Sequence, residues 1–202
     1  RKDIAPSVFA QQYLAEFTDL EGRVYTEFTR DMALKDIPFE PVRWGFSVDF
    51  GYNHPLAAYV YAIGPDDQIH VFRELYARKL DDLQRIQRIK DLTANYEIDI
   101  AVGDSEDPIA LAQLNRELEF GIDSVLQGIN EMKSAFHSGQ LTINEQCTYL
   151  IDELEVYCWK LDKEGRETDQ PVKENDDGVD SVRYFVSKIR NADKLGVDDI
   201  AL

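Results

Sequence analysis

Three aspartates lie at the edges of segments that are predicted to be strands or helices. Asp49 lies at the end of the apolar run Trp44–Phe50, and Asp104 directly follows the run Ile98–Gly103. Asp180 lies near the start of a predicted final helix. A carboxylate at the end of a buried strand is costly unless something compensates it, and a divalent cation is a natural compensator. Converging carboxylates would supply hard oxygen ligands suited to Mg²⁺ or Mn²⁺.

Ordinary structural roles compete with this interpretation. A lone aspartate at a strand end is usually a turn former or a helix cap. Asp176, Asp177 and Asp180, at a helix start, are by default capping acids that the helix dipole favours. The triplet Asp49–Gly51 matches the metal-binding triplet of protein kinases, but the sequence has no glycine-rich loop and no catalytic-loop motif. The metal hypothesis therefore depends on the three aspartates acting together.

The elements around these residues predict an α/β fold. The strand-like runs Trp44–Phe50, Leu56–Ile63 and Gln68–Leu75 are joined by connections so short that they predict an antiparallel meander. Strands and helices then alternate, with strands over 98–103, 122–126 and 141–143, helices over 80–96, 108–118, 129–137, 146–157 and 181–190, and a hairpin or flap from 156 to 173. This order predicts a central mixed sheet with helices on both faces.

Composition excludes several classes of protein. The 202 residues include 39 acidic and 22 basic side chains, a formal net charge of -17, which argues against holding nucleic acid through a basic surface alone. No apolar run approaches the ~18 residues of a membrane span. Cys147 and Cys158 form neither a disulfide framework nor a zinc motif. Without a GxxxxGK[ST] motif, the chain alone is not predicted to hydrolyse ATP.

The first 42 residues read differently from the rest. Ser7–Phe17 predicts a short amphipathic helix, and the following stretch ends in Pro38 and Pro41, which interrupt regular structure. The absence of an initial methionine suggests an excised fragment. We predict that residues 1–42 are a linker or the edge of an upstream domain, and that residues 43–202 form one domain.

Three segments, taken in order, carry a family resemblance. They are WGFSVDFGYNHPLAAYVY (44–61), IAVGDSEDPIALAQL (100–114) and DDGVDSVRYF (176–185). Together they resemble the C-terminal nuclease domain of the large terminase subunit of tailed bacteriophages, the DNA-packaging motor protein. The likeness extends over nearly the whole chain, and residues 8–42 resemble the stretch that joins the packaging ATPase to the nuclease.

The resemblance implies a ribonuclease H-like fold and an endonuclease that cuts concatemeric double-stranded DNA, with little sequence preference, when packaging starts and stops. Position by position, Asp49, Asp104 and Asp180 match the family's catalytic, metal-binding triad. Asp177 stands where many relatives have a histidine, so it is expected to bind the second metal, and Asp176 is either a ligand or a cap. The implied cofactors are two Mg²⁺ or Mn²⁺ ions about 3.5–4 Å apart, bridged by Asp49.

The resemblance also implies partners. Lys133, Lys160 and Lys173 are expected to contact DNA. The other implied partners are the upstream ATPase domain of the same polypeptide, the portal, the procapsid and the small terminase subunit, in the host-cell cytoplasm and away from any membrane.

Two alternatives stay open. A ribonuclease H-like junction resolvase or transposase-type nuclease would share the carboxylates but not the N-terminal linker or the tail hairpin. A non-catalytic acidic metal-binding module would owe its charge to contacts with a basic partner.

Overall fold

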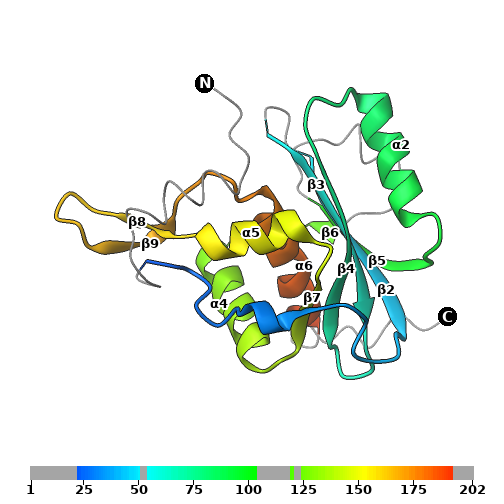
Figure 1. Ribbon diagram of the computed structural model, residues 1–202, viewed down its shortest axis with the longest axis horizontal. Helices are drawn as coiled ribbons and strands as arrows, with labels where there is room; N and C mark the ends of the chain where they lie inside the picture. Colours follow the sequence, from blue (N-terminus) through cyan, green and yellow to red (C-terminus); the bar gives the residue numbers. More distant parts are fainter. Residues whose placement is uncertain (1–21, 51–53, 104–118, 121–123, 193–202) are drawn as a thin grey trace.

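The computed structural model describes residues 22–50, 54–103, 119–120 and 124–192, and a mixed sheet forms its centre (Figure 1). Seven strands lie in the order β1-β7-β4-β3-β2-β5-β6. They are β1 (Ala33–Leu34), β2 (Arg43–Asp49), β3 (Leu56–Ile63), β4 (Ile69–Ala77), β5 (Ile98–Gly103), β6 (Glu119–Phe120) and β7 (Leu141–Asn144). A separate two-stranded sheet pairs β8 (Trp159–Leu161) with β9 (Glu167–Pro171), and the helices are η1 (Arg30–Met32), α2 (Asp82–Thr93), α4 (Val125–His137), α5 (Thr148–Val156) and α6 (Asp177–Ala192).

The strand directions confirm the predicted α/β fold. Strands β2, β3 and β4 form an antiparallel meander. The later strands are parallel to their neighbours: β5 to β2, β6 to β5, and β7 to β4. A parallel connection requires a crossover, and α2 supplies it between the meander and β5.

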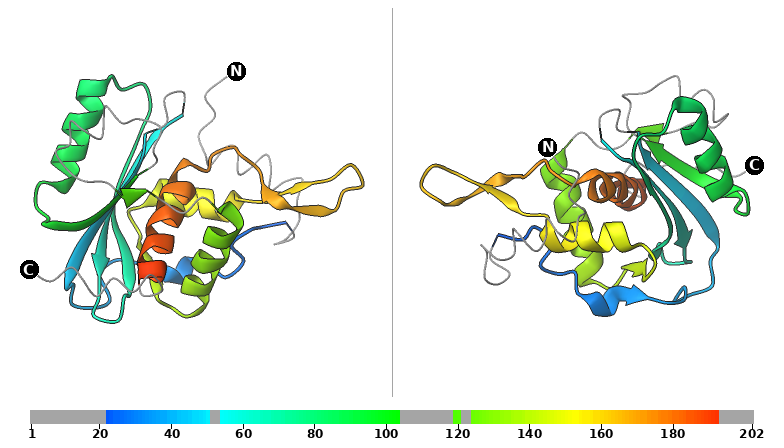
Figure 2. Two further views of the ribbon diagram at one scale, coloured as in Figure 1. Left: turned by 180° about the vertical axis from the view of Figure 1, so that it is seen from behind. Right: turned by 45° about the horizontal axis from the view of Figure 1, so that its top comes forward.

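Helices cover both faces of the sheet, with α2 on one face and α4, α5 and α6 on the other (Figure 2). Along β3, side chains alternate between the two cores, as the pleat requires. Ala57, Tyr59 and Tyr61 join the core under α4, α5 and α6, whereas Ala58 and Val60 join the smaller core under α2. Every residue of β3 is buried, which explains its continuous apolar sequence.

The described part of the N-terminal segment packs onto the second of these faces. Val24, Tyr25 and Phe28 are buried, and the Tyr25 ring stacks on Tyr157 with a centroid distance of 5.8 Å. Strand β1 then pairs in parallel with β7. Residues 22–34 therefore share one core with the rest, while the predicted domain boundary at residue 42 stays a prediction.

Two local predictions were wrong in their boundaries. Val125 and Leu126, predicted to end a strand, begin α4, because Ser124 caps this helix by accepting a hydrogen bond from the Gln127 N–H. Helix α6 starts at Asp177 rather than at residue 181. The predicted helices over 7–17 and 108–118 lie outside the described residues.

The predicted tail hairpin is confirmed, and β8 and β9 extend away from the helical layer (Figure 1). In the described ranges, no helix is both long enough and apolar enough to cross a membrane.

Candidate active site

The end of β2 lies beside the end of β5. These strands are parallel neighbours, and their register pairs Val48 with Gly103. Asp49 is the last residue of β2. Asp104 follows Gly103 in the sequence and lies outside the described residues. The register thus confirms that the strands preceding the first two predicted site aspartates are adjacent and end at the same edge of the sheet.

Helix α6 is fixed against this part of the sheet. The Ser181 and Ser47 hydroxyls are hydrogen-bonded at 2.7 Å, and both residues are fully buried. One turn further on, the Phe185 ring packs over Gly45, where a β-carbon would overlap the ring. Ser181 follows Asp180 directly, and Ser47 precedes Asp49 by two residues. The serine pair therefore ties the helical turn that carries Asp180 to the strand that carries Asp49.

Three buried aspartates lie at the start of α6, Asp176 just before the helix and Asp177 and Asp180 in its first turn, and we call them the acidic cluster. Asn175 turns the chain into the helix with a φ of 53°, a left-handed conformation that asparagine tolerates better than most residues. The Asp176 carbonyl then accepts the Asp180 N–H at 2.7 Å. The unpaired N–H groups and dipole of a helix N-terminus favour negative charge at this position.

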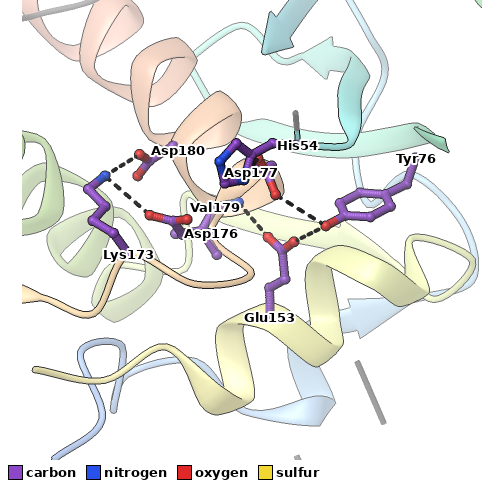
Figure 3. Close-up of polar contacts among 8 residues, drawn as sticks. All are labelled: His54, Tyr76, Glu153, Lys173, Asp176, Asp177, Val179 and Asp180. Carbon is purple, nitrogen blue, oxygen red and sulfur yellow. Dashed lines mark hydrogen bonds and ion pairs between the residues drawn. The ribbon is translucent and has the colours of Figure 1, made fainter. Parts of the chain in front are cut away.

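Two cations contact different oxygens of the Asp180 carboxylate. The Lys173 ammonium donates to Asp180 Oδ2 at 2.6 Å, and Nη2 of the buried Arg183 lies 2.9 Å from Oδ1. The same ammonium lies 3.2 Å from Asp176 Oδ2 (Figure 3). Lys173, predicted to contact DNA, therefore lies among the carboxylates.

The other predicted DNA-contacting lysines lie elsewhere. Lys133 is on α4, with its ammonium 3.6 Å from Glu27 Oε1. Lys160 is exposed on β8. Their role in DNA binding stays a prediction.

Sequence reasoning missed a fourth buried acid, Glu153 of α5. Its carboxylate accepts hydrogen bonds from the Tyr76 hydroxyl at 2.7 Å and from the Val179 N–H of α6 at 3.0 Å (Figure 3). Burial, only partly opposed by these hydrogen bonds, raises the pKa of Glu153 well above its ordinary value. The sequence feature that could have indicated a buried Glu153 is its position next to the apolar stripe of α5, which contains Leu150 and Leu154. Glu153 therefore anchors the first turn of α6 from a second helix.

Asp177 lies between Tyr76 and His54. Burial raises the pKa of Asp177 to about 6, although the nearby His54 favours the charged carboxylate and so acts to lower it. The His54 ring is mostly exposed, and its Nδ1 lies 3.8 Å from Asp177 Oδ1. A carboxyl group with such a pKa changes charge within a readily accessible pH range.

Replacing Asp177 with asparagine is therefore expected to stabilise the metal-free protein at pH 7 but not at pH 4. The folded protein holds the Asp177 proton more tightly than the unfolded chain, whose pKa is near 3.8. The stability that the protonated group contributes is complete below that value and is lost as the pH rises through about 6. Asparagine cannot lose a proton, so the difference at pH 7 should be on the order of 2 kcal/mol.

Urea unfolding with a chelator, between pH 4 and pH 7.5, measures this difference. Asp66→Asn, in the exposed turn between β3 and β4, serves as the control because it removes the same charge from an exposed site. A difference between wild type and Asp177→Asn that does not change with pH would show that this carboxyl is not perturbed.

The donor set of the acidic cluster suits a hard cation. Among residues 22–50, 54–103, 119–120 and 124–192, no three histidine, cysteine, aspartate or glutamate side chains are arranged to hold a metal ion. The Lys173 ammonium instead lies between two carboxylates of the cluster, 2.6 Å from Asp180 Oδ2 and 3.2 Å from the buried Asp176 Oδ2. A positive charge is thus already accommodated here, and carboxylate oxygens are ligands that Mg²⁺ and Mn²⁺ accept.

Comparison with known proteins identifies the family. Residues 46–188 match the family described as Terminase RNaseH-like domain. The large terminase subunit of Escherichia phage T5 is 25% identical over 213 residues, covering 94% of this chain and 47% of that protein. The large terminase of a thermophilic bacteriophage has a TM-score of 0.73 at 19% identity, covering 93% of this chain and 53% of that one. The chain thus spans about half the length of these relatives.

Two shorter structures share the fold over most of their own length. The P22 large terminase nuclease domain has a TM-score of 0.67 at 21% identity, covering 84% of this chain and 93% of that one. The nuclease domain of g2p, the large terminase of bacteriophage SPP1, with bound Mn, has a TM-score of 0.59 at 21% identity, covering 76% and 88%. Both support the ribonuclease H-like fold. Because the family match extends over more than half of its length, the chain belongs to the terminase RNaseH-like domain family.

Proposed function

We propose that this chain is the metal-dependent endonuclease domain of a DNA-packaging terminase large subunit. It would cut concatemeric double-stranded DNA, with little sequence preference, when packaging starts and stops. The observation that carries the proposal is the Ser47–Ser181 hydrogen bond at 2.7 Å, which ties the strand ending in Asp49 to the acidic turn of α6. Membership of the terminase family supports the same function.

The residues proposed to hold two Mg²⁺ or Mn²⁺ ions are Asp49, Asp104, Asp177 and Asp180. Asp104 is included because Gly103, which precedes it, pairs with Val48 of β2. The SPP1 nuclease domain with bound Mn supports the use of a divalent ion. When bound, such ions lower the pKa of an attacking water and stabilise the leaving 3′ oxygen of a phosphodiester.

The protein's own residues position the ligands. Arg183 gives Asp180 a buried counter-charge and orients Oδ1, while Glu153 holds the Val179 N–H and so fixes the turn between Asp177 and Asp180. The carboxylates would act as ligands rather than as proton shuttles.

The wider assembly is also a proposal. Lys133 and Lys160 would meet the DNA backbone, and the upstream ATPase domain would hold DNA near the site, compensating for the net charge of -17. By family, the partners would be the portal, the procapsid and the small terminase subunit in the host-cell cytoplasm.

Nicking and linearisation of a supercoiled plasmid test the proposal. The purified chain is expected to convert the plasmid to open-circular and linear forms with Mn²⁺ or Mg²⁺, and to do nothing with EDTA. A product distribution independent of plasmid sequence is expected. A strong preference for four-way junctions would instead favour a resolvase, and no cleavage with either metal would favour a non-catalytic acidic module.

A further inference from the structure

Lys173 occupies an unusual position for an exposed lysine. About half of its side chain is accessible to solvent, yet its ammonium lies 2.6 Å from Asp180 Oδ2 and 3.2 Å from Asp176 Oδ2. The side chains of these two aspartates are only 9% and 12% exposed. The side chain of this partly exposed lysine thus extends into a buried acidic cluster, where its ammonium contacts two carboxylates.

This contact supplies charge compensation that the cluster needs. The Asp176 and Asp180 carboxylates are both buried and lie beside the same ammonium, and a buried negative charge is costly unless a positive charge compensates it. Burial also disfavours the Lys173 ammonium, but Asp180 and Asp176 outweigh it and raise the pKa of Lys173. In the absence of metal, the ammonium is thus the cation that neutralises this side of the cluster.

The backbone around Lys173 joins this contact to the hairpin. Strand β9 ends at Pro171, and the next residue, Val172, donates its N–H to the Cys158 carbonyl at 2.9 Å, just before β8. Lys173 is therefore the first residue beyond the base of the hairpin. Its position is restrained by the hairpin on one side and by the start of α6 on the other.

We propose that Lys173 is a resident counter-ion of the acidic cluster, and that a divalent cation can bind Asp180 only by displacing the ammonium from Oδ2. This inference rests on the proposed function. It differs from the sequence-based expectation that Lys173 is a DNA contact, because the group with which it competes is the metal. Lys173 would thus set the divalent-ion concentration at which the site fills, and link site filling to the base of the hairpin.

Lys173→Met, which keeps the length of the aliphatic stem but removes the ammonium, tests this directly. Isothermal titration with Mn²⁺, without DNA, is expected to show an affinity up to about fivefold higher than that of wild type, because a partly exposed ion pair contributes up to about 1 kcal/mol. The melting temperature without metal should fall, and the rise on adding Mn²⁺ should exceed that of wild type.

Two further variants separate charge from other effects. Lys163→Met removes the same charge from the exposed hairpin turn and is expected to change Mn²⁺ affinity by less than about twofold. Lys173→Arg keeps the charge and is expected to stay well below Lys173→Met in Mn²⁺ affinity. If Lys173→Met fails to fold, the pair Asp176→Asn and Lys173→Met/Asp176→Asn measures the same ratio with less repulsion in the cluster.

The outcomes distinguish this inference from the proposed function. If wild type binds Mn²⁺ and nicks plasmid, but Lys173→Met binds Mn²⁺ with unchanged or weaker affinity, Lys173 is not a competitor and the inference is wrong while the nuclease stands. If neither wild type nor Lys173→Met binds Mn²⁺ or cuts DNA, both ideas fail together. If Lys173→Met binds Mn²⁺ more tightly than wild type, and Lys163→Met and Lys173→Arg do not, the result supports competition between the Lys173 ammonium and the metal.

Discussion

Replacing Asp180 with asparagine is expected to reduce plasmid cleavage at least about 100-fold and also to destabilise the protein. The carboxamide retains the shape of the side chain but loses the charge that would hold a hard cation. It also leaves the guanidinium of Arg183, which is 1% exposed, without its ionised partner. Removing one partner of a buried ion pair costs about 3 kcal/mol or more, so the melting temperature should fall by several degrees.

Asp49→Asn separates the two effects. It is expected to abolish cleavage to the same extent, because Asp49 is the proposed ligand at the end of β2, while costing less stability than Asp180→Asn. The difference is expected because Asp49 is only partly buried at the end of β2, whereas Asp180 is buried and its carboxylate contacts the fully buried Arg183. Circular dichroism melts and initial cleavage rates with Mn²⁺ measure both properties on the same samples.

Asp66→Asn is again the matched control, since it removes one exposed carboxylate at the opposite end of β3 from the site. It should cleave and melt like wild type. Wild-type cleavage by Asp49→Asn or Asp180→Asn would remove that residue from the site. An unchanged melting temperature in Asp180→Asn would show that the Arg183 ion pair contributes little.

The second large effect is expected from Gly45→Ala in β2. A β-carbon at this position would overlap the Phe185 ring, which stacks on Tyr61 with centroids 3.7 Å apart, so the ring can move only together with its neighbours. Overpacking in a filled core costs about 1–3 kcal/mol. Moving the Phe185 ring away from the new methyl group would push α6 away from β2 and strain the hydrogen bond between Ser47 and Ser181. Cleavage should therefore fall along with stability.

A double-mutant cycle identifies the cause. Phe185→Leu shortens the side chain that meets the new methyl group, so Gly45→Ala/Phe185→Leu should be more stable than the sum of the single changes predicts, with a coupling of about 1 kcal/mol or more. Urea unfolding of the four proteins measures this coupling. Additive effects would mean that α6 and β2 adjust independently, and the proposed positioning of Asp180 by this contact would be wrong.

The sheet was largely predictable because its signals are local. Short turns force neighbouring strands to be antiparallel, and the continuous apolar run over Leu56–Ile63 indicates a strand buried on both faces. Boundaries were less predictable where side-chain caps decide them. Residues 125 and 126, predicted to end a strand, instead begin α4. The side chain of Ser124 caps this helix, and one such hydrogen bond outweighs β-propensity over a few residues.

Only the aspartates of the candidate site could be recognised in the sequence. Aspartates at strand ends and at a helix start can be recognised in the sequence, but the groups that hold them cannot. Glu153 reaches α6 from another helix, and Arg183 and Lys173 act on Asp180 through long side chains whose direction depends on the packing of α6. Local patterns carry no information on such contacts between distant segments, and the family resemblance gave Lys173 only as an expected DNA contact.

A crystal structure of the chain soaked in Mn²⁺, with anomalous scattering measured at the manganese edge, tests the central claim most directly. We expect anomalous density bounded by the carboxylates of Asp49 and Asp180, with a ligand from Asp104, and the Lys173 ammonium moved away from Asp180 Oδ2. Density confined to surface acids, with Lys173 still between Asp176 and Asp180 at saturating Mn²⁺, would contradict a metal-dependent nuclease site at this edge of the sheet.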